Sequence, residues 1–299
     1  MIEEKLKELV HNTWKHFDKF TDKKQVVSTM PILYFGDLEA YKNSKFRIVT
    51  AALNPSDMEF TNHKDNKNYT FFRFPSANKI NREHDSLNNE EVEAYIQSLN
   101  SYFTNKDENN NLTYYSKWFN PNEYLLNGID ASYFSKKYEN TVLHTDICTP
   151  LATNPTWGKG DLNKGLKEEL IKSGLALWQE LIRYLQPDVI LLSAGQDHVR
   201  KKQAKDPFGP LNFSHDEKFH LESIEEFLKY ETKVNGEPFA NGPLIIELHK
   251  FMINSKNCYL FYDTGGNGYF KNLGGDKVGV KGRKNEVGQE IKKYLADKK

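Results

Sequence analysis

Four short runs of apolar residues with few charges stand out from an otherwise polar chain. They cover residues 46–54, 141–145, 188–193 and 258–262. Uninterrupted runs of this length that contain β-branched residues are typical of strands buried on both faces of a sheet. The first run stops at Asn54-Pro55, where proline has no N–H to offer a neighbouring strand, so we expect the chain to turn there.

Helical spacing of apolar residues predicts most of the remaining elements. The clearest stripe joins Leu166, Leu170, Leu177, Leu181 and Leu185, and Pro187 stops it. By the same criterion we predict helices at residues 2–20, 90–103, 166–185, near 221–230, 244–253 and 286–298.

Strands that alternate with helices and long loops indicate an α/β protein. We predict a three-layer α/β/α fold around a mostly parallel, four-stranded sheet. The strands then end at Asn54, Asp146, Ser193 to Gly195 and Asp263, along one edge of the sheet, where ligands bind in such folds. No linker composition separates the polar stretches from their flanks, so we expect one domain over residues 1–299, with insertions at about 81–140 and 200–242.

Composition narrows the classes of partner. The chain carries 41 basic and 41 acidic residues, so its formal net charge is zero and no overall field attracts nucleic acid or a membrane. A polyanion therefore needs a local patch. Two cysteines, Cys148 and Cys258, are too few for a four-cysteine zinc site or an iron–sulfur cluster. The charged N-terminal segment and the lack of a long apolar run predict a cytoplasmic protein without membrane contact.

Five short motifs follow one another along the chain, four of them at predicted strands. They read ALNPS (52–56), FRFPSANK (72–79), LHTDICTPLATNPTW (143–157), PDVILLSAG (187–195) and CYLFYDTGG (258–266). Their order resembles the uracil-DNA glycosylase superfamily, especially the branch whose first motif is Gly-Leu-Asn-Pro-Ser, with Ala52 in place of the glycine. The resemblance implies a monofunctional, metal-free DNA glycosylase without a cofactor, which flips a base and hydrolyses its N-glycosidic bond.

The first two motifs supply candidate residues for water and base binding. The resemblance assigns Asn54 to catalysis, where its amide oxygen holds the attacking water, and Leu53 to the base pocket. It assigns the ring beneath the flipped base to Phe74, or to its neighbour Phe72. Two alternatives stay open: Asn54 only closes an Asx-type turn, and Phe74 is a core aromatic residue.

Asp146 stands where the family reads the base edge with an asparagine. An ionised carboxylate offers only acceptors, whereas an amide offers one donor and one acceptor. On that premise Asp146 pairs with an amino-bearing, cytosine-like base rather than with uracil. The alternative is that Asp146 caps the turn that follows it.

The end of the fourth strand departs further from the family. Asp263-Thr264 replaces the histidine that would stabilise the leaving base, and we interpret Asp263 as a group that stabilises the oxocarbenium ion or binds water. The Gly- and Lys-rich loop that follows is a candidate DNA-binding surface with a wedge residue. The candidate DNA-contacting residues are Ser56, Thr264, Lys271, Leu273, Lys281 and Arg283. The alternative for this loop is a surface loop with no DNA contact.

A rival hypothesis belongs to a different functional class. Without the leaving-group histidine, the chain can be a catalytically silent protein of glycosylase fold that binds nucleic acid or a nucleotide in repair or phage defence. A nucleophile elbow at Ser193 is disfavoured because Leu191 replaces the first glycine and no histidine follows Asp263. We therefore predict a monomeric enzyme that acts on single- or double-stranded DNA.

Overall fold

The computed structural model describes residues 2–61, 69–81, 86–157, 161–194, 219–264, 270, 273–274 and 282–298. Contacts between Cα atoms divide the chain into two compact units, each made of three segments. The first unit comprises Met1–Leu38, Ala52–Tyr115 and Leu143–Leu185, and the second comprises Glu39–Ala51, Ser116–Val142 and Gln186–Lys299. That the chain is one domain with two insertions stays a prediction.

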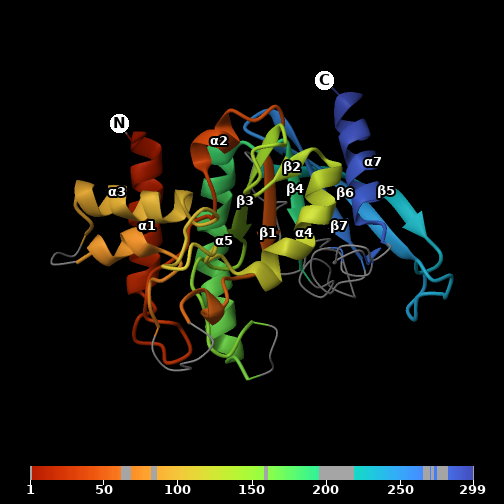
Figure 1. Cartoon of the computed structure of the whole chain (residues 1–299). Helices are drawn as coiled ribbons and strands as arrows, with labels where there is room; N and C mark the ends of the chain where they lie inside the picture. The colour runs from red at the N-terminus through yellow and green to blue at the C-terminus, as the bar shows by residue number, and fades with distance from the viewer. Residues whose placement is uncertain are drawn as a thin grey trace. The chain divides into compact units, whose positions relative to one another are not determined.

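The protein is an α/β protein with a mixed sheet of seven strands in the order β2-β3-β1-β4-β7-β6-β5 (Figure 1). The strands are β1 (Ile48–Ala52), β2 (Ala131–Ser132), β3 (Asn140–Asp146), β4 (Val189–Leu192), β5 (Phe219–Tyr230), β6 (Leu244–Ile253) and β7 (Lys256–Asp263). All four predicted strands form, as β1, β3, β4 and β7. The predicted number of strands is wrong, because β2, β5 and β6 join the same sheet.

Three of the predicted strands run parallel and end at the same level. The pairs β1–β4 and β4–β7 are parallel, with Ala51 opposite Leu192 and Leu192 opposite Tyr262. β2 and β3 also pair in parallel, whereas β5, β6 and β7 are joined antiparallel. The expected common edge at the carboxyl ends of β1, β4 and β7 is therefore confirmed, and Asp263 lies at it.

The predicted helix at 244–253 is wrong, since these residues form β6. The reason is a tight turn: Asn254 and Ser255 have φ of 48° and 65°, and Ile253 pairs with Lys256. Two residues with positive φ are the signature of a two-residue hairpin turn, which commits both flanking segments to antiparallel strands. The apolar run then pairs along its whole length with β5 and β7.

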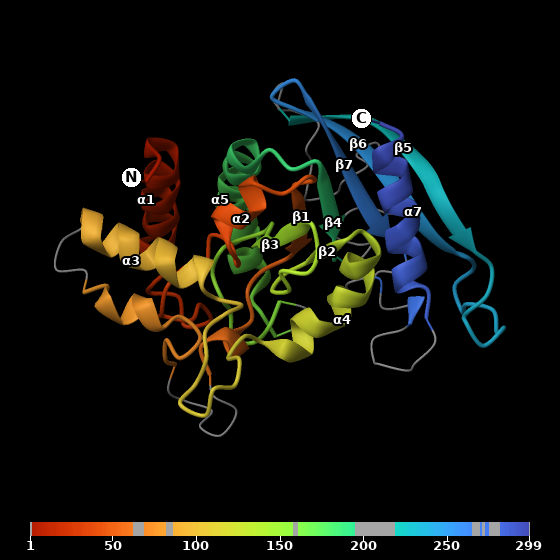
Figure 2. The same ribbon diagram turned by 45° about the horizontal axis from the view of Figure 1, so that its top comes forward.

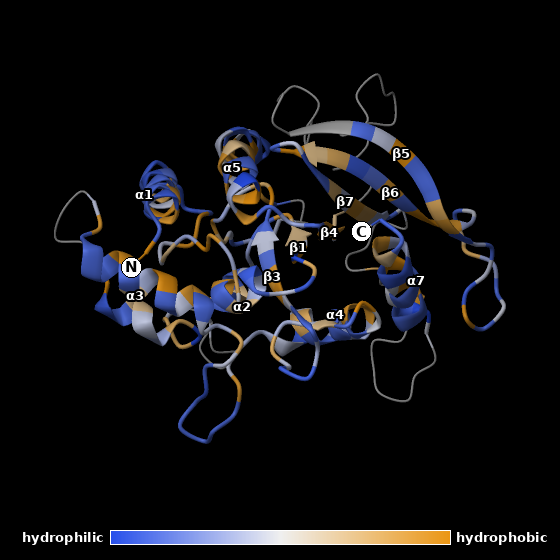
Figure 3. Ribbon diagram, turned by 90° about the horizontal axis from the view of Figure 1, so that it is seen from above, coloured by the Kyte–Doolittle hydropathy of each residue, from blue (hydrophilic) through white to orange (hydrophobic). Residues whose placement is uncertain are grey.

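The predicted helix near 221–230 is also wrong, and here irregular pairing is the reason. β5 pairs antiparallel with β6, but its register shifts between Leu221 and Ser223 and again between Glu226 and Leu228. Such bulges break the alternation of inward and outward side chains, so Ile224 and Phe227 fall three residues apart, as on a helix. Figure 3 shows the resulting uneven bands of hydrophilic and hydrophobic colour along β5.

In the second unit, helix α7 (Lys284–Ala296) packs against helix α4 (Ser116–Gly128) (Figure 2). Gly128 and Gly288 face each other at this crossing, and a Cβ atom on either would overlap a backbone carbonyl oxygen of the other helix. Buried Lys284 of α7 stabilises the packing against α4, because its Nζ donates a hydrogen bond to the Pro121 carbonyl at 3.0 Å. The predicted C-terminal helix is confirmed as α7.

In the first unit, the predicted helices are confirmed as α1 (Glu4–Asp18), α3 (Asn89–Asn100) and α5 (Lys164–Leu185). α1 packs on α5, and α3 packs on the 3-10 helix η2 (Pro75–Lys79). Tyr95 of α3 is fully buried, and its hydroxyl donates to the Pro31 carbonyl and accepts from the Leu33 N–H. The short helix α2 (Leu38–Lys42) completes the described α-helices, none of which has the length and apolarity needed to cross a membrane.

Gly174 should be essential for the packing of α5. A Cβ atom there would overlap the Cys148 carbonyl oxygen and the Cα of Thr149, both backbone atoms that cannot swing away. We expect Gly174→Ala to lower the free energy of unfolding by about 1–3 kcal/mol or more, as overpacking does. Urea denaturation measures this change. Gly165→Ala, on the same helix, meets only the Asn163 side chain at 3.3 Å and should show no comparable loss. Equal effects of both variants would contradict the packing argument.

Candidate active site

Backbone hydrogen bonds join the ends of β1 and β3 within the first unit. The N–H of Ile147 donates to the Ala52 carbonyl, and the N–H of Cys148 donates to the Leu53 carbonyl, each at 2.8 Å. These bonds tie the residues just before Asn54 to the residues just after Asp146. Two of the side chains singled out by sequence therefore come from adjacent strand ends.

The side-chain amide of half-buried Asn54 is fixed by three acceptors on its nitrogen. Nδ2 donates to the Pro55 carbonyl at 3.0 Å, the Leu151 carbonyl at 3.3 Å and Thr153 Oγ1 at 3.1 Å. Because carbonyls accept and never donate, these contacts fix which end of the amide is the nitrogen. Oδ1 receives no hydrogen bond from any described residue, so it remains an acceptor for a water molecule.

Asp146 is a buried carboxyl group without hydrogen-bond donors. Its side chain belongs to a residue that is 5 % exposed, and neither carboxyl oxygen has a hydrogen-bond partner among the described residues. His144 Nε2 lies 3.8 Å from Oδ1, but burial lowers the pKa of His144 to about 3, which leaves the imidazole neutral. Burial, followed by the nearby Glu59 charge, raises the pKa of Asp146 well above its ordinary value.

The protonation of Asp146 changes what it offers to a base. A cytosine-like preference requires an ionised carboxylate with acceptors only, whereas burial raises the pKa of Asp146 well above its ordinary value and so favours the neutral acid. A neutral carboxyl has one O–H donor and one carbonyl acceptor, the same pair that an asparagine amide presents. The preference for a cytosine-like base stays a prediction, and it holds only for the ionised side chain.

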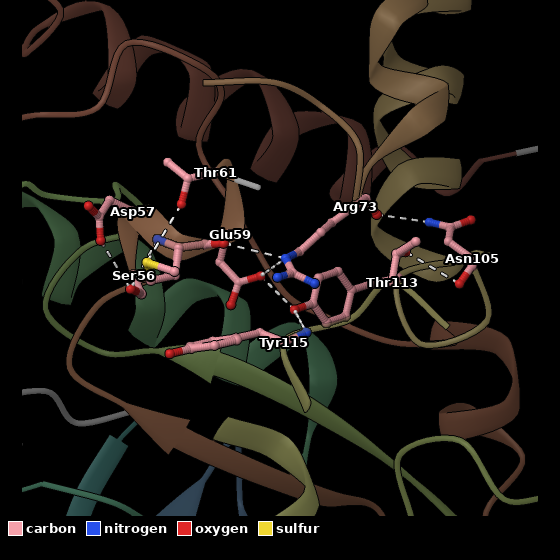
Figure 4. A network of polar contacts seen from close by, with 10 residues as sticks. Ser56, Asp57, Glu59, Thr61, Arg73, Asn105, Thr113 and Tyr115 are labelled. Carbon is pink, nitrogen blue, oxygen red and sulfur yellow. Dashed lines mark hydrogen bonds and ion pairs between the residues drawn. The ribbon is translucent and has the colours of Figure 1, made fainter. Parts of the chain in front are cut away.

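Glu59 stands at the centre of a second buried polar group, shown in Figure 4. Tyr102 donates its hydroxyl to Glu59 Oε2 at 2.5 Å, and Arg73 Nε lies 3.8 Å from the same oxygen. Burial raises the pKa of Glu59 to about 7, against the opposing effects of Arg73 and Tyr102. The Tyr102 hydroxyl in turn accepts from the N–H of Tyr115 at 3.0 Å. This arrangement holds a carboxyl group that is partly ionised at neutral pH.

Sequence reasoning missed Glu59, Arg73 and Tyr102. Glu59 lies in a polar stretch that reads as a loop, and Tyr102 follows α3, so neither has a local signature. The one available signal was Arg73, a charge enclosed by aromatic residues in Phe71-Phe72-Arg73-Phe74. A charge in such a setting needs a buried partner, because an unpaired one would be costly.

The aromatic candidates divide into one core residue and one partly accessible residue. Phe74 is fully buried, with ring centroids of Phe60 and Tyr102 at 5.6 and 5.2 Å. Its ring therefore has no exposed face for a base in this structure, which corresponds to the core alternative. Phe72 is half-buried and stacks under the Arg73 guanidinium at 4.4 Å.

Leu53 and Ser56 flank Asn54 and have structural contacts of their own. Leu53 is half-buried and accepts the Cys148 hydrogen bond described above. Ser56 Oγ accepts from the Met58 N–H at 3.1 Å and so caps the 3-10 helix η1 (Asp57–Glu59). The cap starts the turn that carries Glu59 into the interior.

The other candidates belong to the second unit. Asp263 is buried at the end of β7, and the hydroxyl of Thr264 donates to the Ile245 carbonyl at 3.1 Å. Leu273 is 1 % exposed, so it has no free surface with which to wedge into a base stack. Arg283 donates to the Thr232 carbonyl and stacks on the Tyr230 ring at 4.6 Å. Lys271 and Lys281 lie outside the described residues.

Other possible sites in the described chain carry less chemistry. A shallow surface depression over α3, lined by residues that include Glu93, Gln97 and Asn100, contains none of the candidate residues. Within the described ranges, no three His, Cys, Asp or Glu side chains are grouped so that they would hold a metal ion. Comparison with protein-family models, with curated proteins and with solved structures found no match for the chain.

Glu59 should make the stability of the protein depend on pH. Its pKa is about 7 when folded, against an ordinary value of 4.5, so the folded state keeps a proton that the unfolded state has released. The contribution of Glu59 to the free energy of unfolding is therefore greatest below pH 4.5 and is lost as the pH rises through about 7. The difference amounts to about 3 kcal/mol at most.

Denaturation at several pH values between about 4.5 and 7 tests this dependence. Glu59→Gln should flatten the decline of the unfolding free energy, although Asp146 and Glu123, whose pKa values burial also raises, keep part of it. Exposed Glu108→Gln is the control and should follow the wild type. If Glu59→Gln follows the wild type as well, the buried carboxyl is not the source of the slope.

Proposed function

We propose that this protein is a monofunctional DNA glycosylase that hydrolyses the N-glycosidic bond of a flipped base. The observation that carries the proposal is the amide of Asn54, whose nitrogen has three acceptors and whose oxygen has no hydrogen bond from a described residue, on a strand end that backbone hydrogen bonds join to the strand end of the unpartnered Asp146 carboxyl. Glycoside cleavage needs a held water on one side of the sugar and a group that recognises the leaving base on the other. Adjacent strand ends that present these two groups suit that reaction.

Asn54 has the role of holding the attacking water. Its Oδ1 accepts a hydrogen bond from water, and the three contacts of Nδ2 keep that oxygen in place without reorganisation. An amide is a far weaker base than a carboxylate, so Asn54 orients the water and does not take its proton. The reaction is therefore slower than one in which a general base takes the proton of the water.

Asp146 has the role of reading the base edge, and the base has to open a path to its side chain, which is 1 % exposed. As a neutral acid it accepts from a ring N–H and donates to a ring carbonyl, which is the pattern of uracil. We therefore favour a uracil-type base over the cytosine-like base inferred from an ionised side chain. Phe72 is the better placed of the two aromatic candidates to stack on such a base, since Phe74 is enclosed in the core.

The proposal includes the wider expectations drawn from the resemblance. They are a three-layer, uracil-DNA-glycosylase-like arrangement, a monomer in the cytoplasm, and DNA contacts from Ser56, Thr264, Arg283 and the basic loop. Asp263 would act near the sugar. The competing proposal is a silent glycosylase-like protein that binds nucleic acid without cleaving it.

Base release from a panel of oligonucleotides tests this function. The panel contains uracil, cytosine, 5-substituted cytosines and deaminated purines, in single and double strands. We expect the wild type to release a uracil-type base, and we expect Asn54→Ala to slow release at least about 100-fold, because the water is no longer held. Exposed Asn109→Ala is the matched control and should keep wild-type activity.

Two other outcomes have distinct meanings. If Asn54→Ala releases the base as fast as the wild type, Asn54 has no role in the reaction. DNA binding without release of any base would favour the silent binder. Circular dichroism and thermal melting of Asn54→Ala are needed beside the assay, since the variant also loses three hydrogen bonds that hold its turn.

A further inference from the structure

Glu59 and Asp146 are two buried carboxyl groups with opposite surroundings. Glu59 has a donor, the Tyr102 hydroxyl at 2.5 Å, and a cation, with Arg73 Nε at 3.8 Å. Asp146 has neither among the described residues, since its oxygens lack hydrogen bonds and neighbouring His144 is neutral. A donor and a cation stabilise a carboxylate, whereas an apolar enclosure stabilises the acid. The geometry thus makes Glu59 the group that ionises first and Asp146 the group that keeps its proton to higher pH.

The two groups are close enough to influence one another. Charge on Glu59 further raises the pKa of Asp146, and Asp146 in turn raises that of Cys148. Carboxyls that interact in this way lose their protons as a pair, in two separated steps. The titratable and charged groups that face the pair are Arg73, Tyr102, Tyr115, His144 and Cys148. In many enzymes, two carboxyl groups whose environments separate their pKa values act as an acid and a charged partner.

We propose that Asp146 is the general acid that protonates the leaving base, and that Glu59 is the positioning residue that keeps this proton on Asp146. The inference rests on the proposed glycosylase function. It also supplies a proton for which the sequence provides no histidine after β7. An unpartnered, buried acid at a strand end has a second reason to meet a ligand, because a buried polar group without a hydrogen bond is destabilising.

The step balances as a hydrolysis. The bond between C1′ and the base nitrogen breaks, and its electron pair leaves with the base. The proton of Asp146 passes to the base, on the carbonyl oxygen that the acid contacts. The water held by Asn54 forms the new bond to C1′ and loses its surplus proton to solvent, from which Asp146 is protonated again. The products are the neutral base and an abasic sugar.

Leaving-group dependence distinguishes proton donation from simple base binding. Asp146→Asn keeps one donor and one acceptor but cannot give up a proton. We expect it to slow single-turnover release of uracil about 100- to 10,000-fold, the usual range for general acid catalysis. Release of 5-fluorouracil, whose anion is more stable and needs the proton less, should be slowed at least about tenfold less. Asn54→Ala should slow both substrates by the same factor.

The role of Glu59 has a separate signature in the pH profile. Removing its charge in Glu59→Gln lowers the pKa of Asp146, so the alkaline limb of release should move to lower pH. Tyr102→Phe is the milder variant, since it removes one hydrogen bond and leaves both carboxyl groups. Loss of this hydrogen bond raises the pKa of Glu59, so Glu59 becomes charged only at higher pH. The alkaline limb of the pH profile of base release should therefore change as well. If Asp146→Asn slows both bases equally, or the limb does not move in Glu59→Gln, the proposal is overturned.

Infrared difference spectroscopy keeps this inference separable from the proposed function. The wild type at neutral pH should show the carbonyl band of a protonated, buried Asp146 in addition to the band of partly protonated Glu59, and Asp146→Asn should lose the Asp146 band while keeping that of Glu59. Absence of the Asp146 band overturns the inference even if bases are released. If the Asp146 band is present and no base is released from uracil, 5-fluorouracil or the panel, the proposed function fails together with the donor role, while the protonation of Asp146 stands.

Discussion

Exclusion of water around the Glu59 carboxyl is the condition on which the interior of the first unit depends. Its partners come from segments far apart in the sequence: Arg73 from the aromatic stretch and Tyr102 from the residues after α3, whose hydroxyl in turn accepts from the backbone N–H of Tyr115. Removing any one would leave another polar group buried without compensation, which costs more than the contact itself contributes. The polar group and the surrounding aromatic cluster therefore form together.

Asn54 connects this interior with the proposed chemistry. The same amide closes the turn after β1 and leaves its oxygen without a hydrogen bond from a described residue, so the two interpretations of this residue are compatible. Nδ2 of the side chain donates to the Leu151 carbonyl and to Thr153 Oγ1, whereas Oδ1 takes no part in these hydrogen bonds. A residue that serves both purposes transmits any shift of the loop after Asp146 directly to the water it would hold.

The parts of the fold that sequence could predict are those fixed by local pattern. β1, β3, β4 and β7 are short, apolar and bounded by turn residues, and α5 has an unbroken leucine stripe. β5 and β6 were misassigned because their strand character depends on pairing, on the Asn254-Ser255 turn and on two bulges that imitate helical spacing. Asn54 and Asp146 became candidates because they lie at the ends of predicted strands. Glu59 was not, because its importance lies in burial and in partners that no local pattern encodes.

The bulges of β5 have a further consequence for how molecules of this protein behave in solution. β5 is the last strand of the described sheet, and a long, flat, apolar edge strand is a template for strands of other molecules. Two register shifts twist this strand, and its exposed positions carry charged side chains such as Glu225, Glu226 and Lys229. These features discourage edge-to-edge association. The irregularity that disguised the strand in the sequence thus guards the protein against aggregation.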